Sequence, residues 1–281
     1  MVVIENISEM QRWSEAERRQ GRRIALVPTM GALHDGHLSL VRDAKKRGDR
    51  VVVSLFVNPT QFAPLEDFAG YPRDFERDRR LLDAEGVHVL FHPAVKEMYP
   101  EGFAAGIEIR ELSEPLCGAA RPGHFRGVAT VVAKLFNVVR PHVAIFGCKD
   151  YQQLQIIRRL ARDFNFDVGV IGHPTVREAD GLAMSSRNAY LDPQERKAAL
   201  CLYRALRGAE EIVRRGERRA AAIVAGARGE IAREALARIE YVSLCDPESL
   251  REIDLLQDAA LLALAVRIGK ARLIDNMILK P

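Results

Sequence analysis

Short apolar runs alternate with longer amphipathic segments through the first two-thirds of the chain, and this alternation constrains its fold more than any other feature. The apolar runs are Ile24–Pro28, Val51–Val57, Val87–Phe91, Val143–Phe146 and Val168–Ile171. The segments with helical periodicity are Leu38–Arg47, Arg73–Glu85, Val128–Val139 and Gln152–Phe164. Nearly continuous apolar strands are typical of a parallel sheet covered by helices on both faces. We therefore expect a doubly wound α/β fold, in which ligands bind beyond the carboxyl ends of the strands.

The last third of the chain predicts a smaller α+β domain. Asp192 followed by Pro193 is typical of a helix start, with Asp as the N-cap and Pro in the first helical position. The elements expected beyond it are helices at Pro193–Arg215 and Glu217–Ala237 and strands at Tyr241–Leu244, Leu261–Ile268 and Leu273–Asn276. We place the domain boundary near Pro174–Val176, which gives domains of residues 1–175 and 176–281.

Composition and charge disfavour several classes of protein. Forty-two basic residues against 38 acidic ones give a net charge of +4, too small to indicate a nucleic-acid partner. The arginines of the predicted C-terminal helices alternate with glutamates, as on a solvated, salt-bridged surface. Cys117, Cys148, Cys201 and Cys245 lie too far apart for a zinc pattern or a disulfide framework. No signal peptide is visible, and the most apolar segment, Ala259–Val266, is too short to span a bilayer, so we expect a cytoplasmic protein without a membrane partner.

The segment from Val27 to His37 carries the strongest chemical signal. It follows a predicted strand, opens the first long predicted helix and contains the pattern His-Asp-Gly-His. Two histidines three residues apart lie on one face of a helical turn, beside amides that have no partner within the helix. Such a helix N-terminus binds anions, and imidazoles there donate to phosphate oxygens. Gly31 and Gly36 allow the backbone to approach a nucleotide closely.

Two alternatives remain for this segment: incidental histidines in an ordinary strand–turn–helix, and a metal site, although no third ligand lies nearby. The His-x-Gly-His signature is shared by nucleotidylyltransferases and class I aminoacyl-tRNA synthetases, which attack the α-phosphate of a nucleotide and expel pyrophosphate. Neither a Walker A pattern nor Gly-x-Gly-x-x-Gly occurs, which disfavours P-loop and dinucleotide-binding proteins. The signature therefore indicates adenylate chemistry.

Two further motifs support phosphate binding. In Asp180–Asn188 the run Met-Ser-Ser-Arg supplies two hydroxyls and a guanidinium fork for phosphate oxygens, and it resembles the Lys-Met-Ser-Lys-Ser loop of the same superfamily. In Phe146–Leu154, Lys149 follows a predicted strand and is placed to neutralise charge that develops on phosphates. Gln61 and Gln153 are neutral amides able to orient a hydroxy acid, although a structural role is the alternative for each.

Six motifs that lie in order between Pro28 and Asn188 together resemble the pantothenate synthetase family. They are PTMGALHDGH, FVNPTQF, YPRD, GHFRGVATVV, GCKDYQQL and READGLAMSSRN. The resemblance implies a Rossmann-like catalytic domain, a C-terminal lid domain that carries the Met-Ser-Ser-Arg loop, and a homodimer. It implies that ATP and Mg²⁺ are used to join pantoate to β-alanine through a pantoyl-adenylate.

The resemblance also assigns roles to residues. The implied ATP-binding positions are Met30, Gly31, Ala32, Leu33, His34, Asp35, Gly36, His37, Gly147, Cys148, Lys149, Asp150, Val176, Met184, Ser185, Ser186 and Arg187. The implied catalytic set is His34, His37, Lys149, Ser185, Ser186 and Arg187, with His37 as the proton-donor candidate. The implied substrate contacts are Thr29, Asn58, Gln61, Gln153 and Arg121, the last on an expected mobile loop. Cys148 replaces the Glu of the common family form, and Asp78 is a candidate magnesium contact, with the metal ligands left open.

Three other functions remain open at this stage. A cytidylyltransferase-like enzyme would keep the nucleotide on its product instead of releasing AMP. A catalytically silent regulator would bind adenine nucleotide without releasing pyrophosphate. An RNA-binding protein that uses the Arg-rich helices would show a strongly salt-dependent affinity.

Overall fold

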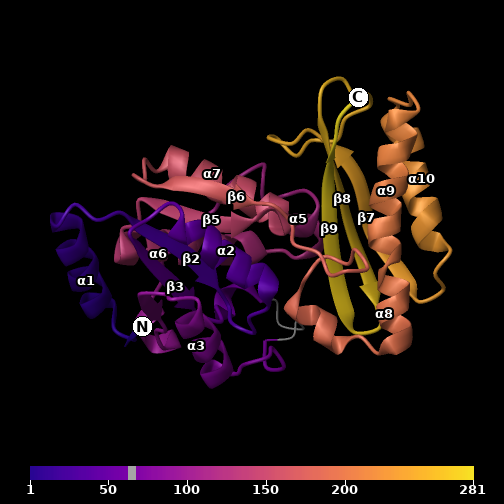
Figure 1. The fold of residues 1–281 in the computed structure, drawn as a ribbon. Coiled ribbons are helices and arrows are strands. Elements are labelled where there is room, and N and C mark those ends of the chain that lie inside the picture. Colours follow the sequence, from indigo (N-terminus) through magenta and orange to yellow (C-terminus); the bar gives the residue numbers. More distant parts are fainter. Residues whose placement is uncertain (63–67) are drawn as a thin grey trace. The chain divides into compact units, whose positions relative to one another are not determined.

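The computed structural model describes residues 1–62 and 68–281, and the chain forms two compact units (Figure 1). Unit 1 consists of Met1–Ser113, Arg121–Cys148 and Gln153–Pro174. Unit 2 consists of Glu114–Ala120, Lys149–Gln152 and Thr175–Pro281. Two short pieces that precede residue 175 therefore belong to unit 2 as well.

Unit 1 is built on a six-stranded sheet in which every pair of neighbours is parallel. Its strands are β1 (Val2–Ile4), β2 (Ile24–Thr29), β3 (Arg50–Leu55), β4 (Val89–Phe91), β5 (Val143–Gly147) and β6 (Gly169–His173), in the order β1-β4-β3-β2-β5-β6. Its helices are α1 (Ile7–Arg19), α2 (Asp35–Lys45), α3 (Phe75–Ala84), α4 (Val95–Met98), α6 (His124–Val139) and α7 (Tyr151–Asp163). The doubly wound α/β fold is confirmed, and each predicted strand and helix of this part is present with its ends shifted by a few residues.

The central strands are buried on both faces, which explains their continuous apolar sequence. Ala25 and Val27 pack into a core with helix α2, whereas Ile24 and Leu26, on the opposite face of the same strand, are buried as well. The sequence missed β1 and α1, so the strand Ile24–Thr29, taken as the first, is the second. Helix α1 buries only Met10 and Ser14 fully, so its sequence shows little apolar periodicity.

The order of the strands places a reversal point between β2 and β5. From β2 the chain proceeds through β3 to β4 on one side, and β5 then pairs with the other edge of β2. In doubly wound sheets, ligands bind at the carboxyl ends of the strands beside such a point. The residues that follow are Met30, after β2, and Cys148, after β5.

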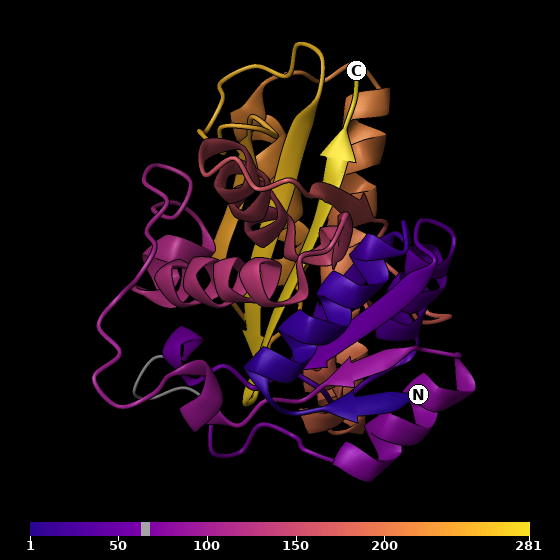
Figure 2. The same cartoon turned by 90° about the vertical axis from the view of Figure 1, so that its left-hand side faces the viewer.

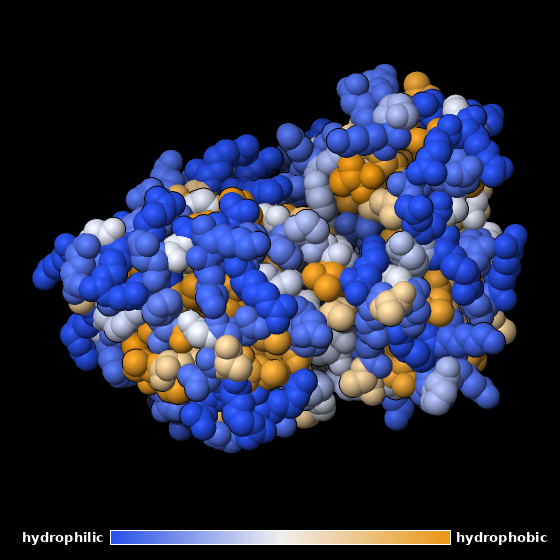
Figure 3. Space-filling model, in the orientation of Figure 1, coloured by the Kyte–Doolittle hydropathy of each residue, from blue (hydrophilic) through white to orange (hydrophobic). Residues whose placement is uncertain are grey.

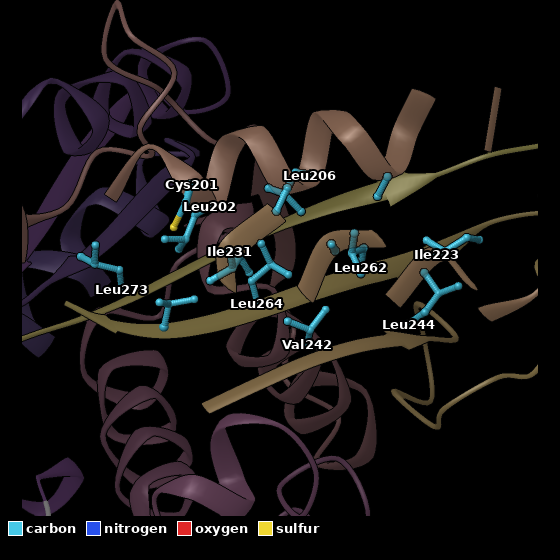
Figure 4. Close-up of a cluster of buried hydrophobic side chains, with 14 of the residues drawn as sticks. Cys201, Leu202, Leu206, Ile223, Ile231, Val242, Leu244, Leu262, Leu264 and Leu273 are labelled. Atoms are coloured by element: carbon cyan, nitrogen blue, oxygen red, sulfur yellow. The ribbon is translucent and has the colours of Figure 1, made fainter. Parts of the chain in front are cut away.

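Unit 2 contains a three-stranded antiparallel sheet covered by helices. Its elements are α5 (Cys117–Ala120), α8 (Pro193–Ala199), α9 (Cys201–Arg214), α10 (Ala220–Ala232), β7 (Ala237–Cys245), β8 (Ala260–Ile268) and β9 (Ala271–Leu279). Figure 2 shows the long strands in yellow with the orange helices behind them. The core between them is apolar and includes Leu206 of α9, Ile231 of α10 and Leu264 of β8 (Figure 4). Short 3₁₀ turns occur at Pro59–Gln61, Cys148–Asp150 and Ser186–Tyr190.

Two predicted helices of this region have different bounds. The segment Pro193–Arg215 is two helices, because the chain tightens at Leu200, whose amide donates to the carbonyl of Lys197, three residues back. Helix α10 begins later than expected, because the carboxylate of Glu217 accepts the amides of Arg218 and Arg219 in a local turn. It also ends earlier, and β7 takes over at Ala237.

Other predictions for the C-terminal region are confirmed. Asp192 is the N-cap of α8 and accepts the amides of Gln194 and Glu195. The arginines of α8 and α9 pair with glutamates; Arg204, for example, binds Glu230 and Glu234. The face in Figure 3 is mostly hydrophilic, with hydrophobic residues in separate patches. Within the described part of the chain, no helix has the length and apolar character needed to cross a membrane.

Candidate active site

The loop between β2 and α2 has two consecutive residues in the left-handed backbone region. Gly31 has φ 85° and Ala32 has φ 51°, the latter being unusual for a residue with a side chain. A Cβ atom on Gly31 would lie 3.0 Å from the carboxylate of Asp78 and 3.2 Å from Leu55, so glycine suits this close approach. Asp78, buried on α3, accepts the amides of Ala32 (2.8 Å) and Leu33 (2.9 Å). The Asp78 carboxylate therefore holds the turn that leads to the histidines.

This arrangement bears on the candidate magnesium contact. Burial raises the pKa of Asp78, against the effect of its two backbone hydrogen bonds and of Arg77, and both of its oxygens accept from amides. Among residues 1–62 and 68–281, no three His, Cys, Asp or Glu side chains are grouped so that they could hold a metal ion. Mg²⁺ at nucleotide sites commonly relies on phosphate oxygens and one or two carboxylates. The described residues thus form no metal cage, and we assign Mg²⁺ no protein ligand.

The two histidines lie at the first turn of α2. His34 is the N-cap residue, and its carbonyl accepts the amide of His37 at 2.8 Å. Its own amide donates to Nδ1 of His37 at 3.4 Å, and the ring centroids are 4.1 Å apart. A neutral imidazole whose Nδ1 accepts carries its proton on Nε2. Both rings are half-buried beside a helix N-terminus, where partial positive charge attracts anions. Asp35 and Gly36 complete this first turn.

The turn after β3 carries two buried polar residues, Asn58 and Gln61. Asn58 caps this turn: its Oδ1 accepts from the Thr60 hydroxyl (2.9 Å) and from the Tyr99 hydroxyl (2.8 Å). Its amide nitrogen donates to the side chain of Gln61 (3.2 Å) and to the carbonyl of Gly127 (3.1 Å). All of these partners fix the turn, so the side chain of Asn58 is engaged within the protein.

Gln61 also connects the turn to the histidine loop and to helix α6. Its side-chain nitrogen lies 2.9 Å from the sulfur of Met30. Its backbone carbonyl accepts from Nδ1 of His124 (2.8 Å) and from Arg121 (3.3 Å). Thr29, at the end of β2, donates to the Ser54 carbonyl and accepts the Gly31 amide. The structure thus brings the predicted residues Thr29, Met30, Gln61 and Arg121 together within unit 1.

The segment after β5 contains the predicted Gly147–Asp150 motif. The Cys148 thiol packs against β6, because a Cβ atom on Gly172 would lie 2.9 Å from the Cys148 sulfur. Burial raises the pKa of this thiol. The Lys149 side chain is 19% exposed, with Nζ 4.0 Å from the carboxylate of Asp150. By its contacts Lys149 belongs to unit 2, whereas Gln153, half-buried in the first turn of α7, belongs to unit 1.

In unit 2 the Ser-Ser-Arg segment follows a tight hairpin. The amide of Met184 donates to the carbonyl of Val176 (3.0 Å), and Arg177 forms an antiparallel bridge with Ala183. Gly181 has φ 96°, and a Cβ atom there would lie 2.1 Å from the ring of Tyr203. A larger residue is therefore excluded at this turn.

Ser185 begins the 3₁₀ turn after the hairpin, and its hydroxyl accepts the amide of Arg187 at 3.3 Å. Ser186 and Arg187 are half-buried in that turn. Within unit 2, Lys149 and Ser185 lie on one small pocket, so two predicted phosphate-binding residues are neighbours there. The other residues that line it are Leu182, Ala183, Asn188, Leu202, Leu273, Ile274 and Asp275.

The support that Asp78 gives to the histidine turn was not expected, because the sequence presented Asp78 only as a candidate magnesium contact. Asp78 carried a usable signal, because it lies four residues before Leu82 on the buried face of α3, where a carboxylate is uncommon. No signal in the sequence indicates the pairing of Arg177 with Asp275 or of Asn276 with Lys149, since these partners are 98 and 127 residues apart.

Comparison with known proteins gives consistent results. The sequence model of the family described as pantoate-beta-alanine ligase matches residues 2–278. The pantothenate synthetase of Heliobacterium modesticaldum is 57% identical over 280 residues, which cover 100% of both chains. That of Thermotoga neapolitana is 54% identical over 279 residues, which cover 99% of this chain and 100% of the relative.

Solved structures show the same similarity. Pantothenate synthetase from Thermus thermophilus has a TM-score of 0.95 and 46% sequence identity, with both chains covered completely. Pantoate-beta-alanine ligase from Francisella tularensis, complexed with beta-gamma ATP and beta-alanine, has a TM-score of 0.80 and 35% identity over 99% of this chain and 97% of its own. With this coverage and identity, the chain belongs to the pantoate–β-alanine ligase family.

Proposed function

We propose that this chain is an ATP-dependent ligase that condenses pantoate with β-alanine through a pantoyl-adenylate. The observation that carries the proposal is the pair His34 and His37 at the N-terminus of α2, after a turn fixed by Asp78 beside the reversal point of the sheet. This arrangement suits a polyphosphate, and membership of the family specifies the two substrates.

In the first step a carboxylate oxygen of pantoate attacks the α-phosphorus of ATP, and the bond to the β-phosphate oxygen breaks. Negative charge then accumulates on the departing pyrophosphate. His37, with its proton on Nε2, and His34 donate to phosphate oxygens, while Lys149 supplies a positive charge. Ser185, Ser186 and Arg187 bind phosphate oxygens by short hydrogen bonds and a guanidinium fork.

In the second step the amine of β-alanine attacks the carbonyl carbon of the adenylate. The bond between this carbon and the bridging oxygen breaks, AMP leaves, and the new amide nitrogen loses a proton. No covalent bond to the enzyme is needed, because AMP is already a good leaving group and catalysis rests on positioning.

Pantoate orientation is proposed for Gln61 and Gln153, with Arg121 nearby. Gln61 is well suited because its backbone and side chain are both held, and a fixed neutral amide orients a hydroxy acid without reacting with an adenylate. Asn58 and Thr29, expected as direct contacts, are better explained as supports, because the hydrogen bonds given above engage their side chains within the protein. The other proposed nucleotide contacts are the backbones of Gly147 and Val176 and the segment around Met184.

Three further expectations stay proposals based on the family. Mg²⁺ accompanies ATP on its phosphates, where it neutralises charge, without an assigned protein ligand. The protein forms a homodimer, and it works in the cytoplasm.

The test measures AMP and pyrophosphate released from ATP and pantoate, with and without β-alanine, by the wild type and by His37→Ala. We expect AMP turnover to require both substrates and to fall about 100-fold in the variant, as is usual for the loss of a group that stabilises transition-state charge. Arg42→Ala, an exposed change on the same helix, is the control for helix integrity.

The same assay separates the alternatives. Pyrophosphate release without AMP, with the nucleotide retained on an acid product, would indicate a cytidylyltransferase-like enzyme. ATP binding without pantoate-dependent pyrophosphate would indicate a silent regulator, and either result would refute the ligase proposal.

A further inference from the structure

Two adjacent residues of strand β9 contact both phosphate-binding segments of unit 2. Asn276 donates from its side-chain nitrogen to the carbonyl of Lys149 at 2.8 Å. Asp275 precedes it and points to the other face of the strand, as successive strand residues do. The amide of Asn276 donates to the carboxylate of Asp275 at 2.8 Å, which links the pair.

Asp275 forms an ion pair with the hairpin that precedes the Ser-Ser-Arg segment. Its carboxylate accepts both terminal nitrogens of Arg177, at 2.6 and 2.9 Å, and the carboxylate is 1% exposed. Arg177 also donates to the carbonyl of Gly181 at 3.0 Å, and its guanidinium lies 4.6 Å from the ring centre of Tyr203. A bidentate pair with a planar partner below it fixes Arg177 in one orientation.

Short-range contacts connect Arg177 to Ser185. Arg177 bridges Ala183 across the hairpin, and the side chain of Asn188 donates to the carbonyl of Ala183 at 3.1 Å. Ser185 lies between these two residues, and its carbonyl accepts the amide of Asn188. Lys149, Ser185 and Asp275 line the same pocket.

We infer that Asp275 and Asn276 are positioning residues for adenylate formation: Asn276 fixes the main chain at Lys149, and Asp275, through Arg177, fixes the hairpin before Ser185. Lysine carries its charge on a flexible four-carbon stem, so the place of its Cα determines which phosphate oxygen it reaches. A single strand that holds both segments keeps the lysine and the serine at a constant separation. This inference rests on the proposed roles of Lys149 and Ser185.

The experiment measures pantoate-dependent exchange of pyrophosphate into ATP, without β-alanine, which isolates the first step. We compare wild type with Asn276→Ala, Lys149→Ala and the double variant. The control is Ser243→Ala, which also loses one side-chain hydrogen bond in unit 2, from β7 to Glu252. Thermal unfolding is recorded for every variant.

Asn276→Ala is expected to lower kcat for exchange about 100-fold, as does an error of about 1 Å in placing a reacting group, with the KM for pantoate little changed. Its effect should disappear in the Lys149→Ala background, because both changes remove one function. Ser243→Ala should shift the unfolding temperature as much and leave kcat near wild type.

A folded Asn276→Ala variant with wild-type kcat, or a loss that adds fully to that of Lys149→Ala, would overturn the inference. If Asn276→Ala does not fold, the isosteric Asn276→Asp, which lacks the donor, is judged by the same criteria. Asp275→Asn is tested in the same way against Ser185→Ala. If Lys149→Ala and Ser185→Ala both retain wild-type exchange, the proposed function fails at those residues, and this outcome is distinct from failure of the inference alone.

Discussion

Asp78 shows how one buried carboxylate shapes the candidate nucleotide loop. Replacement by Asn keeps the shape but substitutes an NH₂ group for one of the two oxygens, so the amide of Ala32 or Leu33 faces a donor. We expect the KM for ATP to rise about tenfold, which corresponds to about 1.4 kcal/mol, a typical cost of one such hydrogen bond. Steady-state ATP titration measures it.

The matched control for this prediction is Asp83→Asn on the same helix. The side chain of Asp83 is 62% exposed, and its partner is the N-terminal amine. An Asp78→Asn enzyme with the KM of the control would show that the loop does not depend on the carboxylate.

A variant of Cys148 shows whether the side chain at this position of the motif after β5 contributes to activity. Burial raises the pKa of the Cys148 thiol, so at pH 7 a smaller fraction is reactive thiolate than at an exposed cysteine. This thiolate fraction increases as the pH rises. We expect slow alkylation by iodoacetamide near neutral pH, faster at pH 9, and kcat within about twofold of wild type for Cys148→Ala. Rapid alkylation at pH 7, or a large loss of kcat in the variant, would mean that the thiol has a role in the site.

At the scale of secondary-structure elements, helix α6 approaches the backbone of the Gln61 turn closely. A Cβ atom on Gly127 would lie 2.3 Å from the carbonyl oxygen of Thr60, so Gly127→Ala must push the turn away from the helix. We expect a stability loss of about 1–3 kcal/mol, as for other overpacked sites, and a higher KM for pantoate. Urea unfolding and pantoate titration measure the two effects.

Gly208→Ala supplies the opposite case. Gly208 lies within α9, and a Cβ atom there would have no neighbour within 4 Å, so alanine should stabilise the helix by about 0.5–1 kcal/mol and leave the KM unchanged. If the two variants gave the same result, steric contact at Gly127 would not be the cause.

Elements with a strong apolar pattern were predictable from sequence, and those without one were not. Strands β2 and β3 are buried on both faces and were found, whereas α1, which has a charged surface and two fully buried residues, was missed. The break between α8 and α9 at Leu200 was not visible in the sequence. The apolar face continues on both sides of it, and a single tightened turn does not disturb that pattern.

For the candidate site, the sequence offers predictions only where chemistry lies in local motifs. The histidines, Lys149 and the two serines were proposed because spacing and residue type are visible in the sequence, and their roles stay predictions. Asp78 and the Asp275–Asn276 pair act through partners 45 or more residues away, which only the folded chain brings together. The supporting roles that we propose for them rest on these contacts.

At the scale of the whole molecule, positive and negative charges nearly balance, which does not favour binding to nucleic acid. The arginines of α9 pair with glutamates, as does Arg233 directly after α10, and the net charge is +4. We expect fluorescence anisotropy with a 20-nucleotide RNA to show weak binding at 50 mM salt and none at 200 mM. Tight binding with a steep salt dependence would contradict this account of the helices and favour an RNA-binding function.

The central claim is that pantoate attacks the α-phosphorus of ATP, and oxygen transfer tests it most directly. The reaction is run with pantoate labelled with ¹⁸O in its carboxylate, and the products are analysed by mass spectrometry. Because the bridging oxygen stays on phosphorus when β-alanine displaces it, the account predicts one ¹⁸O atom in AMP and none in pyrophosphate. Label in inorganic phosphate, with ADP as the nucleotide product, would contradict the account and indicate attack at the γ-phosphorus.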